Sequence, residues 1–166
     1  MPISMITPAD VRPWSLSAPA VHVVVRNRTR AATDLRWAPA LLTLRILRKR
    51  GRRSIRLVDA NCGDGSLLLH LARAARALGF VAIEGRGVDR DPALVVAARL
   101  SAGLLRDPAI GLTFDAGEGA TALLEEAELP ADMVFYAEDD VSVDAIAFAA
   151  GSTAFGAPGL SKRIAA

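Results

Sequence analysis

The sequence predicts an α/β fold with a mostly parallel sheet, and three observations support this prediction. Short apolar runs alternate with longer stretches of helical periodicity between residues 55 and 136. A Gly-containing turn, Asp59-Ala-Asn-Cys-Gly-Asp-Gly65, joins the first apolar run to the helical stretch that follows it. Gly79 and Pro92 stand where one helix would end and the next begin. Alternating elements of this kind imply right-handed crossovers and helices on both faces of one sheet.

The individual elements follow from their patterns. Strands are expected over residues 55–59, 82–89, 110–114 and 132–136, and helices over 66–78, 92–104 and 118–127. Asp91 is the expected N-cap of the helix that begins at Pro92. A further helix over 34–50 precedes the first strand, with Asp34 as its N-cap and Gly51 after its end. Its expected apolar positions include Leu35, Leu42 and Ile46.

The two ends of the chain carry weaker signals. Residues 1–33 predict an extended arm, within which Val21-His-Val-Val-Val25 is either a short strand or an apolar anchor. One short helix is expected over 141–150, and the tail 151–166, rich in small residues, is expected to be loop. The last predicted strand, or a short extra strand beyond it, would then form an uncovered sheet edge. Such an edge predicts a homo-oligomer or a protein partner.

Composition limits the classes of protein that remain. A chain of 166 residues fits one globular domain, here assigned to residues 34–150. No run approaches the ~18 apolar residues that a membrane span requires, and no signal-peptide pattern is present at the start of the chain. The single cysteine, Cys62, excludes an internal disulfide, and no Cys/His cluster offers a metal site. We therefore expect a cytoplasmic protein without a metal ion.

Charge is distributed unevenly along the chain. Residues 1–56 hold 12 Lys/Arg and 2 Asp/Glu, whereas residues 57–166 hold 8 Lys/Arg and 16 Asp/Glu. One interpretation is nucleic-acid binding through the arginines of residues 45–56. The other is that the basic segment packs against the acidic remainder. We favour the second because no aromatic residues alternate with the arginines to stack on bases.

The turn after the first predicted strand is the best candidate for a ligand site. A Gly-containing turn at the carboxyl end of a strand brings bare backbone close to a small molecule. Two acids in this turn, Asp59 and Asp64, disfavour a pyrophosphate and favour a cationic ligand that carries a nucleoside. The pair Gly63 and Gly65 is followed by Leu68, where the dinucleotide fingerprint has Gly or Ala. A nucleotide-dependent oxidoreductase is therefore the least favoured enzyme class.

Four motifs in order resemble those of class I S-adenosylmethionine-dependent methyltransferases. Asp59-Ala-Asn-Cys-Gly-Asp-Gly65 is similar to their first motif, D-x-G-x-G-x-G, and Gly87-Val-Asp-Arg-Asp-Pro92 is similar to their second. Residues 114–116 and 131–136 stand where the third and fourth motifs belong. The resemblance covers residues 55–136 and implies a Rossmann-like three-layer sandwich with a mostly parallel sheet, lacking the usual C-terminal strands.

The resemblance also implies a cofactor, S-adenosylmethionine, and the residues around it. Asp59 would lie near the methionyl end, and Asp89 would accept hydrogen bonds from the ribose hydroxyls. The turn residues that would contact the cofactor are Asn61, Cys62, Gly63 and Gly65. Asn61 replaces the usual first Gly, and Asn tolerates the left-handed conformation better than other side chains do. Cys62 is expected to fill space behind the turn rather than to act as a nucleophile.

The remaining implied contacts lie at the ends of later strands. Arg90 would lie over the adenine, and Asp115 and Ala116 beside it. Tyr136 would face the transferred methyl group. Of the acids that follow it, Glu138 or Asp139 could act as general base, although a run of acids is also typical of a solvated turn.

The expected function is transfer of a methyl group from S-adenosylmethionine to an acceptor that the sequence does not identify. The main alternative is a non-catalytic, cofactor-binding subunit that acts through a partner or a homodimer. A nucleic-acid methyltransferase guided by the arginine-rich segment is a further alternative, which predicts salt-dependent binding of RNA or DNA.

Overall fold

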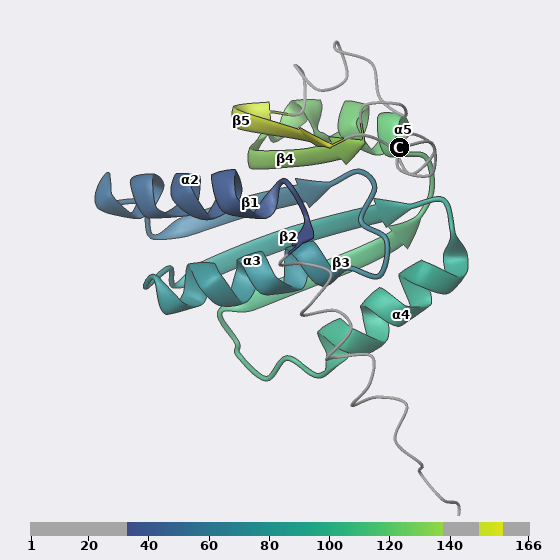
Figure 1. The fold of residues 1–166 in the computed structure, drawn as a ribbon, viewed down its shortest axis with the longest axis horizontal. Helices are drawn as coiled ribbons and strands as arrows, with labels where there is room; N and C mark the ends of the chain where they lie inside the picture. The colour runs from purple at the N-terminus through teal and green to yellow at the C-terminus, as the bar shows by residue number, and fades with distance from the viewer. Residues whose placement is uncertain (1–32, 138–149, 158–166) are drawn as a thin grey trace, which may run out of the picture.

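The computed structural model describes residues 33–137 and 150–157, which form one five-stranded parallel sheet with helices on both faces (Figure 1). The strand order is β3-β2-β1-β4-β5. The elements along the chain are α2 (Trp37–Lys49), β1 (Ser54–Asp59), α3 (Ser66–Ala77), β2 (Ala82–Asp89), α4 (Pro92–Gly103), β3 (Ile110–Ala116), α5 (Gly119–Glu125), η2 (Glu126–Glu128), β4 (Ala131–Ala137) and β5 (Ala150–Ala157). The predicted α/β class with a parallel sheet is confirmed.

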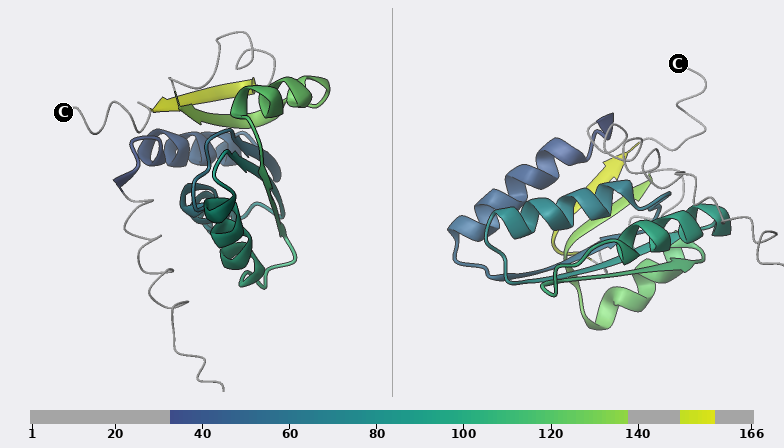
Figure 2. Two further views of the ribbon diagram at one scale, coloured as in Figure 1. Left: turned by 90° about the vertical axis from the view of Figure 1, so that its right-hand side faces the viewer. Right: turned by 90° about the horizontal axis from the view of Figure 1, so that it is seen from below.

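Three layers are visible when the sheet is seen edge-on (Figure 2). Helices α2, α3 and α4 cover one face, and α5 lies on the other. The larger core lies under α3 and includes Leu57 of β1, Leu68 of α3 and Phe135 of β4, each fully buried. Val58, which follows Leu57, and Val134, which precedes Phe135, belong to a smaller core beneath α5 because successive side chains of a strand point to opposite faces. This alternation decides which side chains can share a site.

The boundaries between residues 54 and 137 agree closely with the sequence patterns. Strand β2 coincides with its predicted range, and α3 begins at Ser66 as expected. Asp91 is the N-cap of α4 and accepts a hydrogen bond of 2.8 Å from the backbone N–H of Ala93, with Pro92 at the first helical position. The cap prediction is therefore confirmed.

The start of the first helix was predicted incorrectly. Asp34 is not its N-cap, because α2 begins at Trp37 and Arg36 takes the N-cap position. The carboxylate of Asp34 accepts instead from the backbone N–H and the guanidinium of Arg36. Leu42 and Ile46 are also exposed rather than buried, and α2 contributes Ala40 and Leu44 to the core. The arm predicted over residues 1–33 lies outside the described residues except for Thr33.

The C-terminal prediction needs a larger correction. The tail was expected to be loop, but residues 150–157 form β5, which pairs in parallel with β4. Phe155 stacks on Phe135 with ring centroids 5.2 Å apart, which attaches the strand to the core. Alanine, glycine and serine have low strand propensity, so sequence pattern alone does not indicate this strand. The predicted helix at 141–150 lies outside the described residues except for Ala150, which belongs to β5.

Ion pairs connect the basic N-terminal segment to the acidic remainder. Arg52 and Asp132 form a pair at 2.5 Å. Arg56 pairs with Glu126, which is buried in the 3₁₀ helix after α5. The prediction that the basic segment packs against the acidic body is therefore confirmed for these two arginines. In residues 33–137 and 150–157, no helix combines the length and apolarity that crossing a membrane requires.

Candidate functional site

The loop between β1 and α3 is held against both neighbouring strands by backbone hydrogen bonds. The N–H of Ala60 donates to the carbonyl of Phe135 on β4 at 2.8 Å, and the N–H of Cys62 donates to the carbonyl of Val88 on β2 at 3.0 Å. A third bond of 2.9 Å, from the N–H of Gly65 to the carbonyl of Cys62, closes the turn. The loop is thus fixed at the carboxyl edge of the sheet, where open α/β sheets bind ligands.

The two glycines of the loop serve different purposes. Both have positive φ, +56° at Gly63 and +73° at Gly65. A Cβ at Gly65 would lie 2.8 Å from the ring of Phe114 and 2.9 Å from Ala98, so this position has no room for a side chain. A Cβ at Gly63 would meet no atom of the described residues within 4 Å, so the backbone there borders open space in this part of the structure. Asn61 does not have a positive φ, so its expected left-handed conformation is not found.

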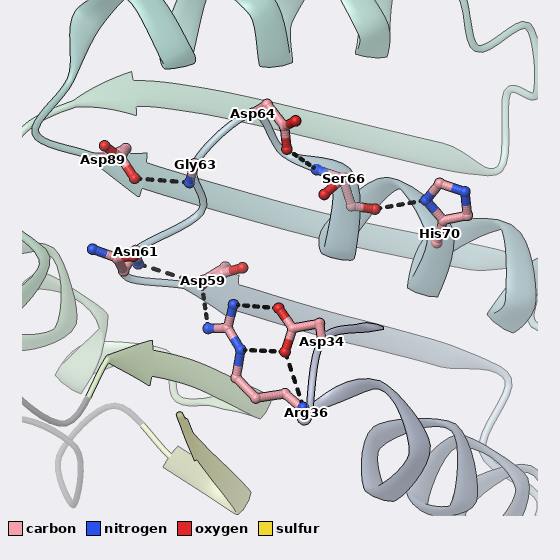
Figure 3. Close-up of polar contacts among 9 residues, drawn as sticks. All are labelled: Asp34, Arg36, Asp59, Asn61, Gly63, Asp64, Ser66, His70 and Asp89. Carbon is pink, nitrogen blue, oxygen red and sulfur yellow. Dashed lines mark hydrogen bonds and ion pairs between the residues drawn. The ribbon is translucent and has the colours of Figure 1, made fainter. Parts of the chain in front are cut away.

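Asp59 is fully buried at the end of β1 and interacts with a side chain from the start of α2 (Figure 3). Its Oδ1 accepts from Nη1 of Arg36 at 3.2 Å and from the backbone N–H of Asn61 at 3.3 Å. Arg36 in turn donates to both carboxylate oxygens of Asp34, from Nε at 3.1 Å and from Nη2 at 3.0 Å. The second oxygen of Asp59, Oδ2, is buried and has no hydrogen-bond partner among the residues that the structure describes.

Burial and charge act in opposite directions on these groups. Burial raises the pKa of Asp59, and the nearby Arg36 offsets only part of that rise. Burial alone would lower the pKa of Arg36, but the carboxylates of Asp59 and Asp34 outweigh it and raise that pKa. Arg36 is therefore permanently charged. Burial destabilises the ionised form of Asp59, and an additional cationic hydrogen-bond donor would stabilise it.

Asp89, the acid expected to bind ribose, organises the loop. Its Oδ2 accepts from the backbone N–H of Gly63 at 2.7 Å, and its Oδ1 accepts from the backbone N–H of Asp91 at 2.9 Å. The side chain is 7% exposed and lies on the α3 face of the sheet, as Asp59 does. The structure thus brings together Asp59, Asp89 and the glycine loop.

The residues expected around the adenine divide between the two faces. Ala116 is the register partner of Asp89 and shares its face of the sheet. Asp115 lies on the opposite face, where Arg86 is 3.7 Å away, and it also pairs at 3.4 Å with Arg99 of α4. Arg90 forms an ion pair of 2.5 Å with Glu118, an acid that sequence reasoning missed. Asp115 therefore does not lie beside Asp89, and Glu118 is the acid placed close to Arg90.

Of the three residues expected near the reacting methyl group, only Tyr136 belongs to the described part of the chain. Tyr136 packs against the smaller core beneath α5. A Cβ added at Gly156 of β5 would lie 2.9 Å from the hydroxyl oxygen of Tyr136. Tyr136 points to the face opposite Asp59, and Phe135 is the β4 residue that stands beside Asp59 in the register. The proposed bases Glu138 and Asp139 lie outside the described residues. The structure therefore corrects the expected position of Tyr136.

Cys62 is buried, as expected of a side chain that fills space behind the turn. Burial together with the carboxylates of Asp59 and Asp89 raises the pKa of its thiol. A thiol that resists ionisation is a poor nucleophile. Within the described part of the chain, no group of three or more His, Cys, Asp or Glu residues could hold a metal ion.

Comparison with known proteins finds similarity among solved structures. Neither a protein-family model nor a curated protein sequence matches the chain. A methyltransferase from Geobacter sulfurreducens is 18% identical with a TM-score of 0.50, over 80% of this chain and 65% of that protein. Magnesium protoporphyrin IX methyltransferase from Synechocystis PCC 6803, solved with S-adenosylhomocysteine, is 21% identical with a TM-score of 0.43, over 69% and 46%. A Listeria monocytogenes protein described as a class I S-adenosylmethionine-dependent methyltransferase is 27% identical with a TM-score of 0.48, over 58% and 28%.

The similarity to the Geobacter protein supports the fold. The match to the Geobacter methyltransferase spans most of the chain and shows a shared Rossmann-like architecture. The resemblance found in the sequence is therefore confirmed at the level of fold: the chain has the Rossmann-like fold of class I S-adenosylmethionine-dependent methyltransferases. It spans less than two thirds of the length of each of the three proteins.

Proposed function

We propose that the chain binds S-adenosylmethionine at the loop after β1 and transfers its methyl group to an acceptor not yet identified. The observation that carries this proposal is Oδ2 of Asp59, a fully buried carboxylate oxygen beside a glycine loop that finds no hydrogen-bond partner within residues 33–137 and 150–157. A buried charged oxygen without a donor is costly, and a ligand ammonium would remove that cost. The methionyl part of S-adenosylmethionine carries such an ammonium.

The rest of the site suits the other parts of this cofactor. Asp89 holds the loop through backbone N–H groups, and its carboxylate oxygens retain lone pairs for ribose hydroxyls. Arg90 and Glu118 offer a cation and an acceptor for the edge of the adenine. When bound, the cofactor supplies an electrophilic methyl group. The protein contributes binding, orientation and exclusion of water.

Two measurements test this proposal. Equilibrium dialysis with S-adenosylmethionine labelled in its methyl group should show saturable retention by the wild type and strongly reduced retention by Asp59→Asn, which keeps the shape but removes the charge. Transfer of label to small-molecule or protein acceptors would support the enzyme. Retention without transfer to any acceptor would favour the non-catalytic cofactor-binding subunit, and no retention by folded protein would contradict both.

A further inference from the structure

Three chain segments meet at the amino edge of the sheet, where its parallel strands begin. The C-terminal ends of α2 and α3 lie side by side there (Figures 1 and 2). Beyond them, the backbone N–H of Val81 donates to the carbonyl of Arg53 at 2.8 Å. Arg76 of α3 pairs with Asp107 at 2.8 Å, which brings the loop before β3 to the same edge. The three segments therefore share one surface, here called the amino-edge surface.

The amino-edge surface carries more cations than its own acids neutralise. Arg52 pairs with Asp132 and Arg76 pairs with Asp107, so these two acids are already used. Six more basic residues are exposed, and their side chains make no ion pair or hydrogen bond with any residue in the described part of the chain: Arg45, Lys49, Arg50, Arg53, Arg73 and Arg106. Packing against the acidic remainder therefore explains only part of the basic segment.

The six cations extend over all three segments. Arg50 and Arg53 lie in the turn between α2 and β1, and Arg106 lies in the loop before β3. Arg73 is one turn before Arg76 on α3, so the two share a face of that helix. Like charges gathered on one surface repel each other, and a polyanion bound across them relieves this repulsion.

The chemistry of the surface indicates which polyanion it fits. Five of the six residues are arginines, whose planar guanidinium donates two parallel hydrogen bonds to a phosphate. Within residues 45–56, 73–81 and 106–109, the sole aromatic side chain is that of Phe80, which is fully buried and unable to stack on a base. A duplex suits such a surface better than a single strand does, because its bases are already stacked and its backbone presents the phosphates.

We propose that the amino-edge surface binds the phosphate backbone of a nucleic-acid duplex without reading its base sequence. Strand β1 has six residues and rises ~3.3 Å per residue, so the surface lies about 20 Å from Asp59 at the other end of the strand. The duplex is thus held away from the glycine loop. The inference goes beyond the proposed function and does not depend on it.

The test is fluorescence anisotropy of a labelled DNA duplex of about 20 base pairs, titrated with the full chain in the absence of cofactor. Each phosphate that a cation neutralises contributes about −0.9 to the slope of log affinity against log salt concentration. Contacts from most of the six cations predict a slope of about −4 to −5, hence a loss of affinity of at least a few hundredfold between about 50 and 200 mM salt. A duplex of different sequence should bind equally well.

Variants locate the binding to this surface. Arg50→Gln combined with Arg53→Gln removes two exposed cations without breaking a side-chain contact among the described residues, so the fold should persist. This double variant should bind at least about tenfold more weakly near 100 mM salt, with a slope smaller by about 2. Arg73→Gln combined with Arg106→Gln should have the same effect. Arg99→Gln, an exposed arginine of α4 that donates to the carbonyl of Phe114, is the control and should bind within about twofold of the wild type, because distant charges are screened.

The remaining outcomes would overturn the inference. These are a wild-type affinity that does not depend on salt, full affinity in both double variants, and tighter binding to the single strand than to the duplex. Tighter binding at the same salt concentration to phosphatidylserine vesicles or to polyglutamate would assign the surface to an anionic membrane or to an acidic protein instead. Failure to bind S-adenosylhomocysteine, with duplex binding intact, would contradict the proposed function alone.

Discussion

The carboxylate of Asp89 accepts a hydrogen bond of 2.7 Å from the backbone N–H of Gly63, a residue 26 positions earlier in the chain. This bond ties the loop after β1 to the end of β2, so the two segments that border the site are held as one unit. Gly63 also borders open space, which leaves its backbone available to a ligand. The loop is therefore preorganised by the same carboxylate that is proposed to bind ribose.

Loss of this bond should loosen the loop even without ligand. Asp89→Asn can accept with one oxygen only, so it cannot hold both Gly63 and Asp91. We expect the amide of Gly63 to exchange its hydrogen about tenfold faster, in line with the loss of a charge-assisted hydrogen bond. Hydrogen exchange followed by NMR measures this. Asp107→Asn, at the amino end of β3, is the control. Equal exchange rates of the Gly63 amide in the two variants would contradict the coupling between Asp89 and the loop.

A second contact supports the loop from the α5 side. A Cβ at Gly119 would clash with the carbonyl oxygen of Ala60, a backbone atom that cannot shift without displacing the loop. Gly119→Ala should therefore destabilise the protein by about 1–3 kcal/mol. Gly111→Ala is the matched control, because a Cβ there meets no atom within 4 Å and alanine suits a strand better than glycine. Thermal unfolding measures the stability of the two variants. Equal melting temperatures would contradict the close contact between Gly119 and Ala60.

The residues that sequence reasoning placed correctly and incorrectly differ in a physical way. Asp59 and Asp89 follow apolar runs in the chain, so local pattern locates them at strand ends. Arg36 and Glu118 gain their roles from partners 23 and 28 residues away, Asp59 and Arg90, which no local pattern encodes. Local pattern therefore locates strand ends but not the side chains that meet there.

Two of the incorrect placements come from the alternation of side chains along a strand. In a strand, a shift of one position moves a side chain to the other face of the sheet. Tyr136 and Asp115 were both placed near the correct strand end, but on the face away from Asp59 and Asp89. Strand β5 was missed for another reason: its small residues lack the alternating pattern of a strand, and its pairing with β4 provides the signal only in three dimensions.

Binding should depend on pH through Asp59. Burial raises its pKa above the ordinary value of 3.8, and an ammonium ligand needs the ionised carboxylate. Ligand binding therefore lowers this pKa and releases a proton, so affinity falls as pH decreases through the raised pKa, by at most about tenfold per pH unit. Calorimetry of S-adenosylhomocysteine binding in two buffers of different ionisation enthalpy measures the release. Asp59→Asn should show no release, and a wild-type affinity that is unchanged from neutral to acidic pH would contradict this role.

Strand β5, an outer strand of the sheet that the described residues form, supports a prediction about assembly. Strand β5 is eight residues long and contains neither a charged residue nor a proline, the two common devices that prevent edge pairing. We propose that a second copy of the chain pairs with this edge. Sedimentation velocity at tens of micromolar should then detect a dimer, and Ala154→Lys, at an exposed position of the strand, should weaken it. A strictly monomeric wild type would contradict the proposal.

The central claim is that the loop after β1, with Asp59 and Asp89, is a site for S-adenosylmethionine. The most direct test is calorimetric titration of the wild type with S-adenosylhomocysteine, with Asp89→Ala and the distant control Asp107→Ala beside it. The account predicts saturable micromolar binding that Asp89→Ala weakens at least about tenfold and Asp107→Ala leaves unchanged. A folded wild-type protein that gives no binding, or equal binding by all three proteins, would contradict it.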